Sequence, residues 1–165
     1  FKNFAAAVAK QGKAITVPQV GLTFNLGSAV CTILAVNTDK KDLNNTSIVM
    51  RIVYGETSFL FTGDTTKKLP VPTEEMAGEM TDVYLPILGS VDVVKYVHHG
   101  YARDAAAPDM MRFDPRYVVI SADIGTGDKV IRRLFPESPV KMIRSGSRTH
   151  VVETDGESLT VIPEV

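Results

Sequence analysis

Two short stretches decide the fold, Phe59–Asp64 (FLFTGD) and, further along the chain, Val93–Gly100 (VVKYVHHG). Each is a run of apolar, β-branched and aromatic residues that stops at polar side chains able to do chemistry. Buried strands of an α/β sheet deliver reactive groups to the carboxyl edge of the sheet in this way. We therefore expect Asp64 and the His98–His99 pair to meet at one edge, an arrangement that suits a metal-dependent hydrolase.

Composition sets the limits of this hypothesis. A chain of 165 residues predicts one domain, spanning residues 1–165. The hydrophobic content of 44% and the charged content of 22% are ordinary for a globular protein. A net charge of −1 argues against a protein that mainly coats nucleic acid. The single Cys31 excludes an intramolecular disulfide and a cysteine-built zinc site, and we interpret it as a small core residue.

Membrane and targeting signals are lacking in this sequence. No run reaches the ~18 consecutive apolar residues of a membrane span, and no leader with a cleavage site is found. We expect the chain as given to be soluble, with its compartment undetermined. The sequence starts at Phe1 inside a helical pattern, so we expect a processed chain or a piece of a longer one.

The first half of the chain is predicted to be rich in strands, and in the second half strands alternate with helices. Apolar spacing predicts a helix over residues 1–13, stopped by Gly12. Strand patterns then follow at 14–17, 21–26, 29–36, 47–53 and 58–62, with a loop at 37–45 and a hairpin turn at 54–57. Beyond Asp64, predicted helices at 73–84, 104–112 and 128–135 alternate with strands at 91–97, 117–121 and 140–143. A terminal hairpin over 150–162 is expected to turn at Asp155–Gly156 in a type I′ geometry. The pattern indicates a single mixed α/β unit.

Asp64 has two interpretations. Gly and Asp are common turn residues, so Thr62-Gly63-Asp64 can simply be a strand followed by a turn. Alternatively, Gly63 permits close backbone approach and the carboxylate bridges two metal ions. Asp123 repeats the pattern of a carboxylate after a strand and is a weaker candidate ligand.

The His98-His99-Gly100 stretch is more informative. Histidine is the commonest side-chain metal ligand and an effective acid or base near neutral pH. Neighbouring side chains of an extended backbone point to opposite faces, so the two histidines are expected to do different jobs unless the strand has already ended. One would bind metal and the other would donate a proton or support the site. The alternative is a pair of surface histidines, and His150 is expected to be structural or exposed.

The segment 44–47 (NNTS) is most simply a polar loop whose side chains cap backbone groups.

Four segments together resemble the metallo-β-lactamase-fold hydrolases. They are residues 44–51, 54–64, 91–101 and 117–121. The closest pattern is that of the branch typified by the β-lactamase-like domain of the competence protein ComEC, which runs N-N-x-S, then Y-G-x-x-S-F-L-F-T-G-D, then D-V-L-K-x-x-H-H-G, then a strand ending in Ser. The resemblance covers residues 15–165.

The resemblance implies an αβ/βα sandwich with a dinuclear site, usually zinc or manganese, at one edge of its two sheets. Asp64 would be the metal-bridging aspartate, and His98 and His99 would be the metal-ligating or proton-donating histidines. Of the two, His98 is the one that we expect to bind the metal. Asn45 and Ser47 would line the same pocket, supported by Gly63 and Gly100.

Two motifs of the family are missing. The leading H-x-H-x-D-H motif, expected upstream of a helix like residues 1–13, is absent, so the fold would be partial at its N-terminus. A late Gly-His-Pro is also absent, and residues 123–128 (DIGTGD) occupy its place. With so few ligands, the chain on its own should bind metal weakly.

Three functional hypotheses therefore remain. The first is a metal-dependent hydrolase of a phosphodiester or other ester, with part of its metal site outside this chain. The second is a catalytically degenerate relative that serves binding or assembly. The third is an unrelated α/β domain. The partners expected are nucleic acid or a small ester substrate, with possible self-association through exposed apolar sheet surface.

Overall fold

The computed structural model describes residues 2–36, 43–64, 89–101, 110–122, 127–146 and 149–163. The described residues of the first half form α1 (Lys2–Lys10), β1 (Thr23–Leu26), β2 (Ala29–Val36), β3 (Ile48–Tyr54) and β4 (Thr57–Phe61), with a short 3-10 helix, η1 (Leu43–Thr46), before β3. The second half contains β5 (Val93–Lys95), the 3-10 turn η3 (Val97–Gly100), β6 (Tyr117–Ile120), α4 (Gly127–Leu134), β7 (Lys141–Arg144), β8 (His150–Thr154) and β9 (Leu159–Pro163).

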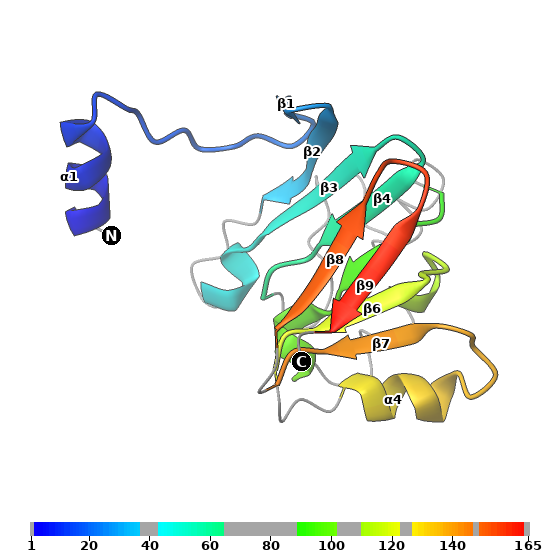
Figure 1. The fold of residues 1–165 in the computed structure, drawn as a ribbon. Coiled ribbons are helices and arrows are strands. Elements are labelled where there is room, and N and C mark those ends of the chain that lie inside the picture. The colour runs from blue at the N-terminus through cyan, green and yellow to red at the C-terminus, as the bar shows by residue number, and fades with distance from the viewer. Residues whose placement is uncertain are drawn as a thin grey trace.

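Strands β1 to β7 form one seven-stranded sheet in sequence order (Figure 1). Strands β1 to β4 pair antiparallel, through Gly turns and hairpins, whereas β4, β5, β6 and β7 pair parallel. The switch comes at the β4–β5 pair, and a parallel neighbour cannot be joined by a tight hairpin turn but needs a longer crossover connection. The mixed α/β architecture predicted from the sequence is therefore confirmed.

The two faces of this sheet are covered differently. On the face that we call the helix face, Leu60, Val94, Val118 and Ile120 are buried. They pack in one cluster with apolar residues beyond the strands: Phe113, Met110, Val130 and Ile131. The opposite face, the hairpin face, is crossed by the two-stranded sheet of β8 and β9 (Figure 1). Among the described residues the arrangement is thus helices, a seven-stranded sheet, and a hairpin.

The hairpin is fastened to the sheet at its far end. The hydroxyls of Thr57 and Thr154 lie 2.9 Å apart, and the backbone N–H of Glu56 donates to the carbonyl of Gly156. Gly55 lies so close to Gly156 that a Cβ at position 55 would collide with the Gly156 backbone. Strand β8 therefore runs diagonally, from the end of β7 to the turn between β3 and β4.

A second set of contacts lies at the same end of the sheet, where β4, β5 and β6 begin. The Asp92 carboxylate accepts hydrogen bonds from the backbone N–H of Ser58 at 2.9 Å and from its hydroxyl at 3.0 Å. The Asp92 carbonyl accepts from the backbone N–H groups of Arg116 and Tyr117. The starts of β4, β5 and β6 are thereby held in register, which fixes where their carboxyl ends arrive.

Several sequence predictions need correction. Residues 14–17 form no strand, and Ile15 and Val17 are 45% and 78% exposed, because this stretch has no neighbouring strand to pair with among the described residues. The buried strand expected over 91–97 is shorter, Val93–Lys95, because the chain turns into η3 at Val97. The helix over 73–84, the loop at 37–42 and all but the end of the helix over 104–112 lie outside the described residues.

The terminal hairpin is present, but its turn differs from the prediction. The last pair is Thr154 with Leu159, so the loop has four residues rather than a two-residue type I′ turn. Asp155 explains the difference, since its carboxylate accepts hydrogen bonds from the backbone N–H groups of Glu157 at 2.9 Å and Ser158 at 2.7 Å. The Ser158 hydroxyl adds a third at 3.0 Å. The side chain, and not a pair of left-handed residues, closes this loop.

This loop gives a pH prediction. The hydrogen bonds from the backbone of Ser158, then of Glu157, lower the pKa of Asp155 from 3.8 to about 2. Because the folded pKa is below the unfolded one, the stabilisation is complete above pH 3.8 and is lost as the pH falls through about 2. Carboxyl NMR titration of the folded protein should show this value, and Ser158→Ala should raise it by removing the hydroxyl donor. An Asp155 that titrates near 3.8 contradicts the capped loop.

No helix in the described ranges is both long and apolar enough to span a membrane.

Candidate metal-binding edge

The carboxyl ends of three neighbouring parallel strands bring the candidate residues together. Strands β4, β5 and β6 are paired in the register Phe59, Val93, Tyr117. Asp64 follows the end of β4, His99 lies in η3 beyond β5, and Ser121 comes directly after β6. Of the Asp64 and His98–His99 group expected at one sheet edge, the structure brings the side chains of Asp64 and His99 together.

Asp64 and His99 face each other directly. Asp64 Oδ1 lies 3.3 Å from His99 Nε2, and both side chains are about two-fifths exposed, at 41% and 42%. The other ring nitrogen, His99 Nδ1, lies 2.9 Å from the Ser121 hydroxyl and 3.1 Å from the Ser121 carbonyl. When Nδ1 donates its proton to that carbonyl, the neutral ring turns the lone pair of Nε2 toward Asp64, which is the form that binds a metal.

An unusual backbone conformation places His99 there. His98 and His99 have φ angles of 43° and 54°, in the left-handed region that non-glycine residues seldom occupy. The strand has already ended at Lys95, so the expectation of opposite faces in an extended backbone does not apply. The His98 N–H donates to the Gly63 carbonyl, which ties this turn to the residue before Asp64. The His98 ring lies beside Tyr101, with 6.1 Å between ring centroids.

Lys95 belongs to the cluster, and the sequence analysis missed it. Its ammonium donates to the Gly63 carbonyl at 2.9 Å and the Tyr96 carbonyl at 3.3 Å, and lies 3.6 Å from Asp64 Oδ1. Burial lowers the pKa of Lys95, and the charge of Asp64 opposes that shift. A single charge inside the apolar run of residues 93–97 was the available signal, since a buried lysine is nearly always paired.

Ser47 and Gly63 support Asp64 from the other side. The Ser47 hydroxyl accepts the Asp64 backbone N–H at 2.8 Å and donates to the Asn44 carbonyl at 2.8 Å. A Cβ on Gly63 would lie 2.5 Å from Ser47 Cβ, so only glycine fits there. Asn45 lies in η1 next to this contact. The structure thus places the 44–47 segment beside Asp64.

The remaining candidates lie at or beyond the border of this cluster. Gly100 is buried at the end of η3, with a φ of 80°. His150 lies at the start of β8, with Nε2 2.9 Å from the Arg144 carbonyl. Asp123 lies outside the described residues. Within the described ranges, no group of three or more His, Cys, Asp or Glu side chains is arranged to hold a metal ion.

An apolar hollow adjoins the cluster on the hairpin face. It lies between the sheet and β8 and has a volume of about 300 Å³. We call it the hairpin slot. Its apolar lining comes from Phe59, Leu60, Phe61, Val93, Val119 and Val152, and its polar lining from Lys95, Ser121 and His150.

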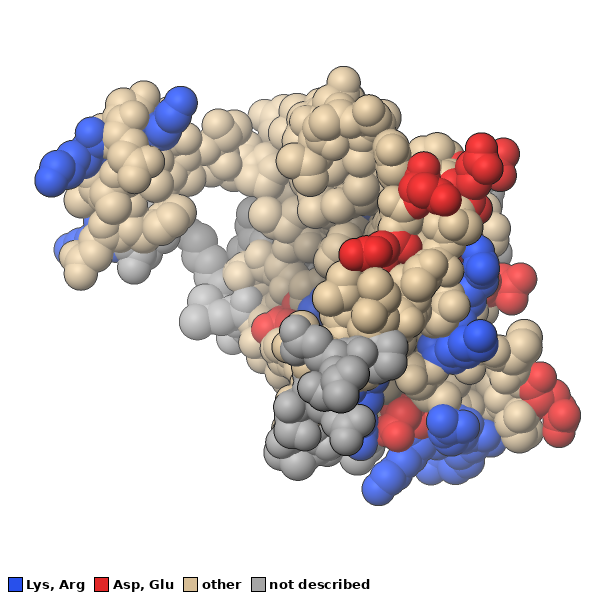
Figure 2. All heavy atoms as spheres, viewed as in Figure 1, with Lys and Arg blue, Asp and Glu red and all other residues tan. Residues whose placement is uncertain are grey.

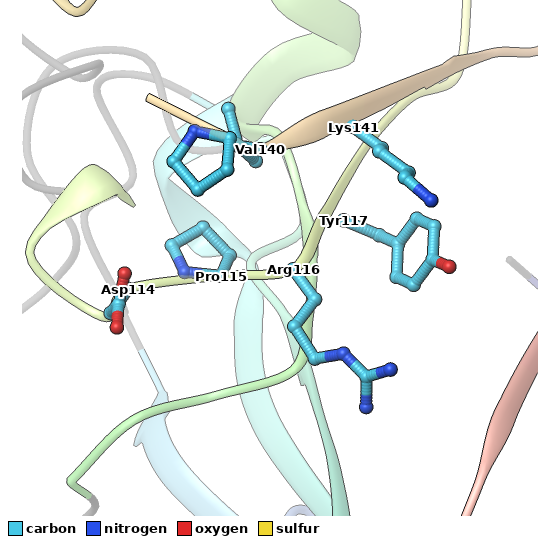
Figure 3. Close-up of a pocket in the computed structure, with 7 residues that line it drawn as sticks. Asp114, Pro115, Arg116, Tyr117, Val140 and Lys141 are labelled. Carbon is cyan, nitrogen blue, oxygen red and sulfur yellow. The ribbon is translucent and has the colours of Figure 1, made fainter. Parts of the chain in front are cut away.

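A second hollow lies at the opposite edge, where β6 and β7 begin (Figure 3). Tyr117, Arg116 and Lys141 point to one side of it and Asp114 lies at the other end. The Lys141 ammonium is 5.8 Å from the centre of the Tyr117 ring. This hollow contains one carboxylate and no histidine, so it has less catalytic potential than the Asp64–His99 edge. On the face shown in Figure 2, basic side chains gather over α4 but acidic ones lie nearby, so no single sign of charge dominates.

The sheet order defines a mixed α/β fold, with the candidate residues at the carboxyl edge of its parallel strands. The fold is similar to that of part of CmlA, a diiron β-hydroxylase from Streptomyces venezuelae, with a TM-score of 0.58 and 15% sequence identity over 97% of this chain. A mutant of CmlA, E377D, matches with a TM-score of 0.56 and 18% identity over 85% of this chain.

These similarities have a defined extent. The chain spans about a third of the CmlA structures, 37% and 34% of their lengths. No protein-family model matches the sequence, and no curated protein matches it. At such low identity the comparison shows the fold alone. The diiron centre is a property of CmlA.

Proposed function

We propose that the Asp64–His99 edge is part of the metal site of a hydrolase that acts on a phosphodiester or another ester. One observation carries this proposal, the 3.3 Å between Asp64 Oδ1 and His99 Nε2. Two ligands that each lie ~2.0–2.2 Å from a tetrahedral zinc ion are roughly 3.4 Å apart. The two atoms therefore have the separation of neighbouring ligands, and both side chains are partly exposed.

The described residues fit part of a metal shell. A catalytic zinc takes three protein ligands, and the described residues bring two together. In this proposal the missing ligands come from outside the described residues, either from Asp123 or from a segment beyond this chain. The metal, zinc or manganese, would supply an activated water and polarise the ester.

The residues of this chain would then have distinct tasks. Ser121 holds the His99 ring in the orientation that exposes Nε2. Ser47 fixes the backbone of Asp64, and Lys95 joins the ends of β4 and β5 beneath it. The placement of His99 favours it over His98 as the ligand. His98, next to Tyr101, is our candidate for proton transfer to the leaving group.

Metal binding by the full-length protein tests the proposal. Asp64→Asn and His99→Ala should each reduce bound zinc or manganese to background and abolish hydrolysis of bis(p-nitrophenyl) phosphate or p-nitrophenyl esters. Ser121→Ala should weaken metal binding by at most about 10- to 100-fold. The effect is limited because the carbonyl of residue 121, which also contacts His99 Nδ1, remains.

His150→Ala is the matched control, because this histidine lies away from Asp64 and contacts the Arg144 carbonyl. It should keep full metal content. If the full-length protein binds no transition metal, or if Asp64→Asn leaves metal content and hydrolysis unchanged, the hydrolase assignment fails.

A second candidate function is binding or assembly by a relative that has lost catalysis. Lys95 favours it, because its ammonium lies 3.6 Å from Asp64 Oδ1 and already supplies a fixed positive charge to the carboxylate. In that case neither the wild type nor Lys95→Met would hold metal in elemental analysis. Under the hydrolase proposal, the wild-type protein does.

A further inference from the structure

The residues that line the hairpin slot determine which kind of chemical group can bind there. Its floor is the hairpin face of the sheet and its wall is β8, from which Val152 faces inward. Most of its lining is apolar, including two phenylalanines, Phe59 and Phe61. Among the residues that the structure describes, no aspartate or glutamate lines it. A phosphate or a sugar placed there would lose water without gaining enough hydrogen bonds, whereas an apolar group would be stabilised.

The slot adjoins the candidate metal-binding edge, because two residues line the slot and also contact that edge. Lys95 lines the slot while its ammonium lies 3.6 Å from Asp64 Oδ1. Ser121 lines the slot while its hydroxyl lies 2.9 Å from His99 Nδ1. The Lys95 ammonium already donates to two carbonyls, so the stem of this side chain is the part available to the slot.

We propose that the hairpin slot binds the apolar acyl or aryl group of an ester substrate, which places the ester bond at Asp64 and His99. This inference rests on the proposed hydrolase function and names its substrate class. It favours a small, partly apolar ester over a nucleic acid, because the described lining is mostly apolar and the Lys95 ammonium already donates to two carbonyls. The apolar group supplies binding energy beside the reacting bond, and its size limits which esters fit.

Binding without turnover tests the slot independently of catalysis. The probe is hexanamide, a neutral amide with an apolar chain, followed by ligand-observed NMR on the full-length protein, with acetamide as the short-chain comparison. Val152→Phe fills the slot, and Val151→Phe is its matched control because Val151 is on the same strand, faces away and is 39% exposed. We expect about tenfold weaker hexanamide binding in Val152→Phe, no change in Val151→Phe, and no detectable acetamide binding.

A second variant protects the test against misfolding. Phe61 lines the slot but is 40% exposed, so Phe61→Ala should fold and still weaken hexanamide binding. Exposed apolar residues elsewhere, such as Phe24 and Leu26, would bind the probe equally in all variants. Hexanamide that does not bind the wild type, or that binds Val152→Phe and Phe61→Ala as it binds the wild type, overturns the inference.

The catalytic measurement separates the two proposals. The full-length protein should hydrolyse p-nitrophenyl hexanoate with a lower KM than p-nitrophenyl acetate, and Val152→Phe should remove that preference. If hexanamide binds in the slot but no ester is hydrolysed, the slot stands as a binding site and the hydrolase assignment fails. If bis(p-nitrophenyl) phosphate is hydrolysed but hexanamide does not bind, the hydrolase stands and the slot inference fails.

Discussion

Phe113→Ala should destabilise the protein by roughly 3–5 kcal/mol, the usual cost of emptying a buried aromatic site. Phe113 is fully buried in the helix-face cluster, and its carbonyl accepts the Val91 N–H just before β5. The loss combines the transfer free energy of the ring with a cavity that the surrounding residues can fill only in part. Urea denaturation, followed by circular dichroism, gives the free energy of unfolding.

Two comparisons make this result specific. Phe4→Ala removes the same ring from α1, where the side chain is 61% exposed and no residue of the helix is buried, so stability should hardly change. Phe113→Leu keeps most of the volume and should cost less than about 1.5 kcal/mol. Because Phe113 lies on the helix face, metal binding per folded molecule should stay constant. A Phe113→Ala protein as stable as Phe4→Ala would contradict the core described above.

Gly63→Ala should cost roughly 2–5 kcal/mol and disturb Asp64 as well, since backbone strain and overpacking act together. Gly63 has a φ of 64°, and a Cβ there would lie 2.5 Å from Ser47 Cβ and 2.6 Å from Ser47 Oγ. To relieve the clash, Ser47 must move away from the Asp64 N–H that its hydroxyl accepts. We therefore expect lower stability in urea and weaker metal binding by the folded fraction.

Gly27→Ala separates strain from collision. Gly27 has a φ of 60°, nearly the same as Gly63, but an added Cβ meets nothing within 4 Å. The loss of stability in Gly27→Ala therefore measures the cost of the left-handed backbone conformation alone. Ser47→Gly in the Gly63→Ala background removes the colliding atoms and should recover part of the stability. If Gly63→Ala and Gly27→Ala cost the same, the close approach of Ser47 to Gly63 plays no role.

Much of the sheet could be predicted because each strand carries its own signal. The runs that became β4, β5 and β6 are apolar, β-branched or aromatic, and stop at polar residues. Parallel strands end at one edge, so the meeting of Asp64 with a histidine followed from these stops. The exception is residues 14–17, where the alternation of Ile15 and Val17 suits a strand but pairing depends on a neighbour that the local sequence does not specify.

The details of the site could not be predicted because they depend on contacts between distant segments. The left-handed conformation of His98 and His99 has no local signal, since non-glycine residues seldom adopt it and the Gly63 carbonyl that accepts the His98 N–H lies beyond the end of β4. The role of Lys95 likewise depends on carbonyls at the ends of two strands. The roles proposed for Asp64, His98 and His99 stay predictions, as does the likeness to the ComEC branch.

Strand β8 covers the hairpin face but comes late in the sequence, so its position sets the order in which the molecule can be completed during synthesis. Asp64, Lys95, His99 and Ser121 all leave the ribosome before β8 begins, so the edge can assemble on a chain that is still growing. Strand β8, which forms the wall of the slot, is synthesised later. The hydroxyl contact that holds it joins Thr57 to Thr154, which are 97 residues apart in the sequence. A nascent chain released before Thr154 would carry Asp64 and His99 without the strand that covers the hairpin face beside them.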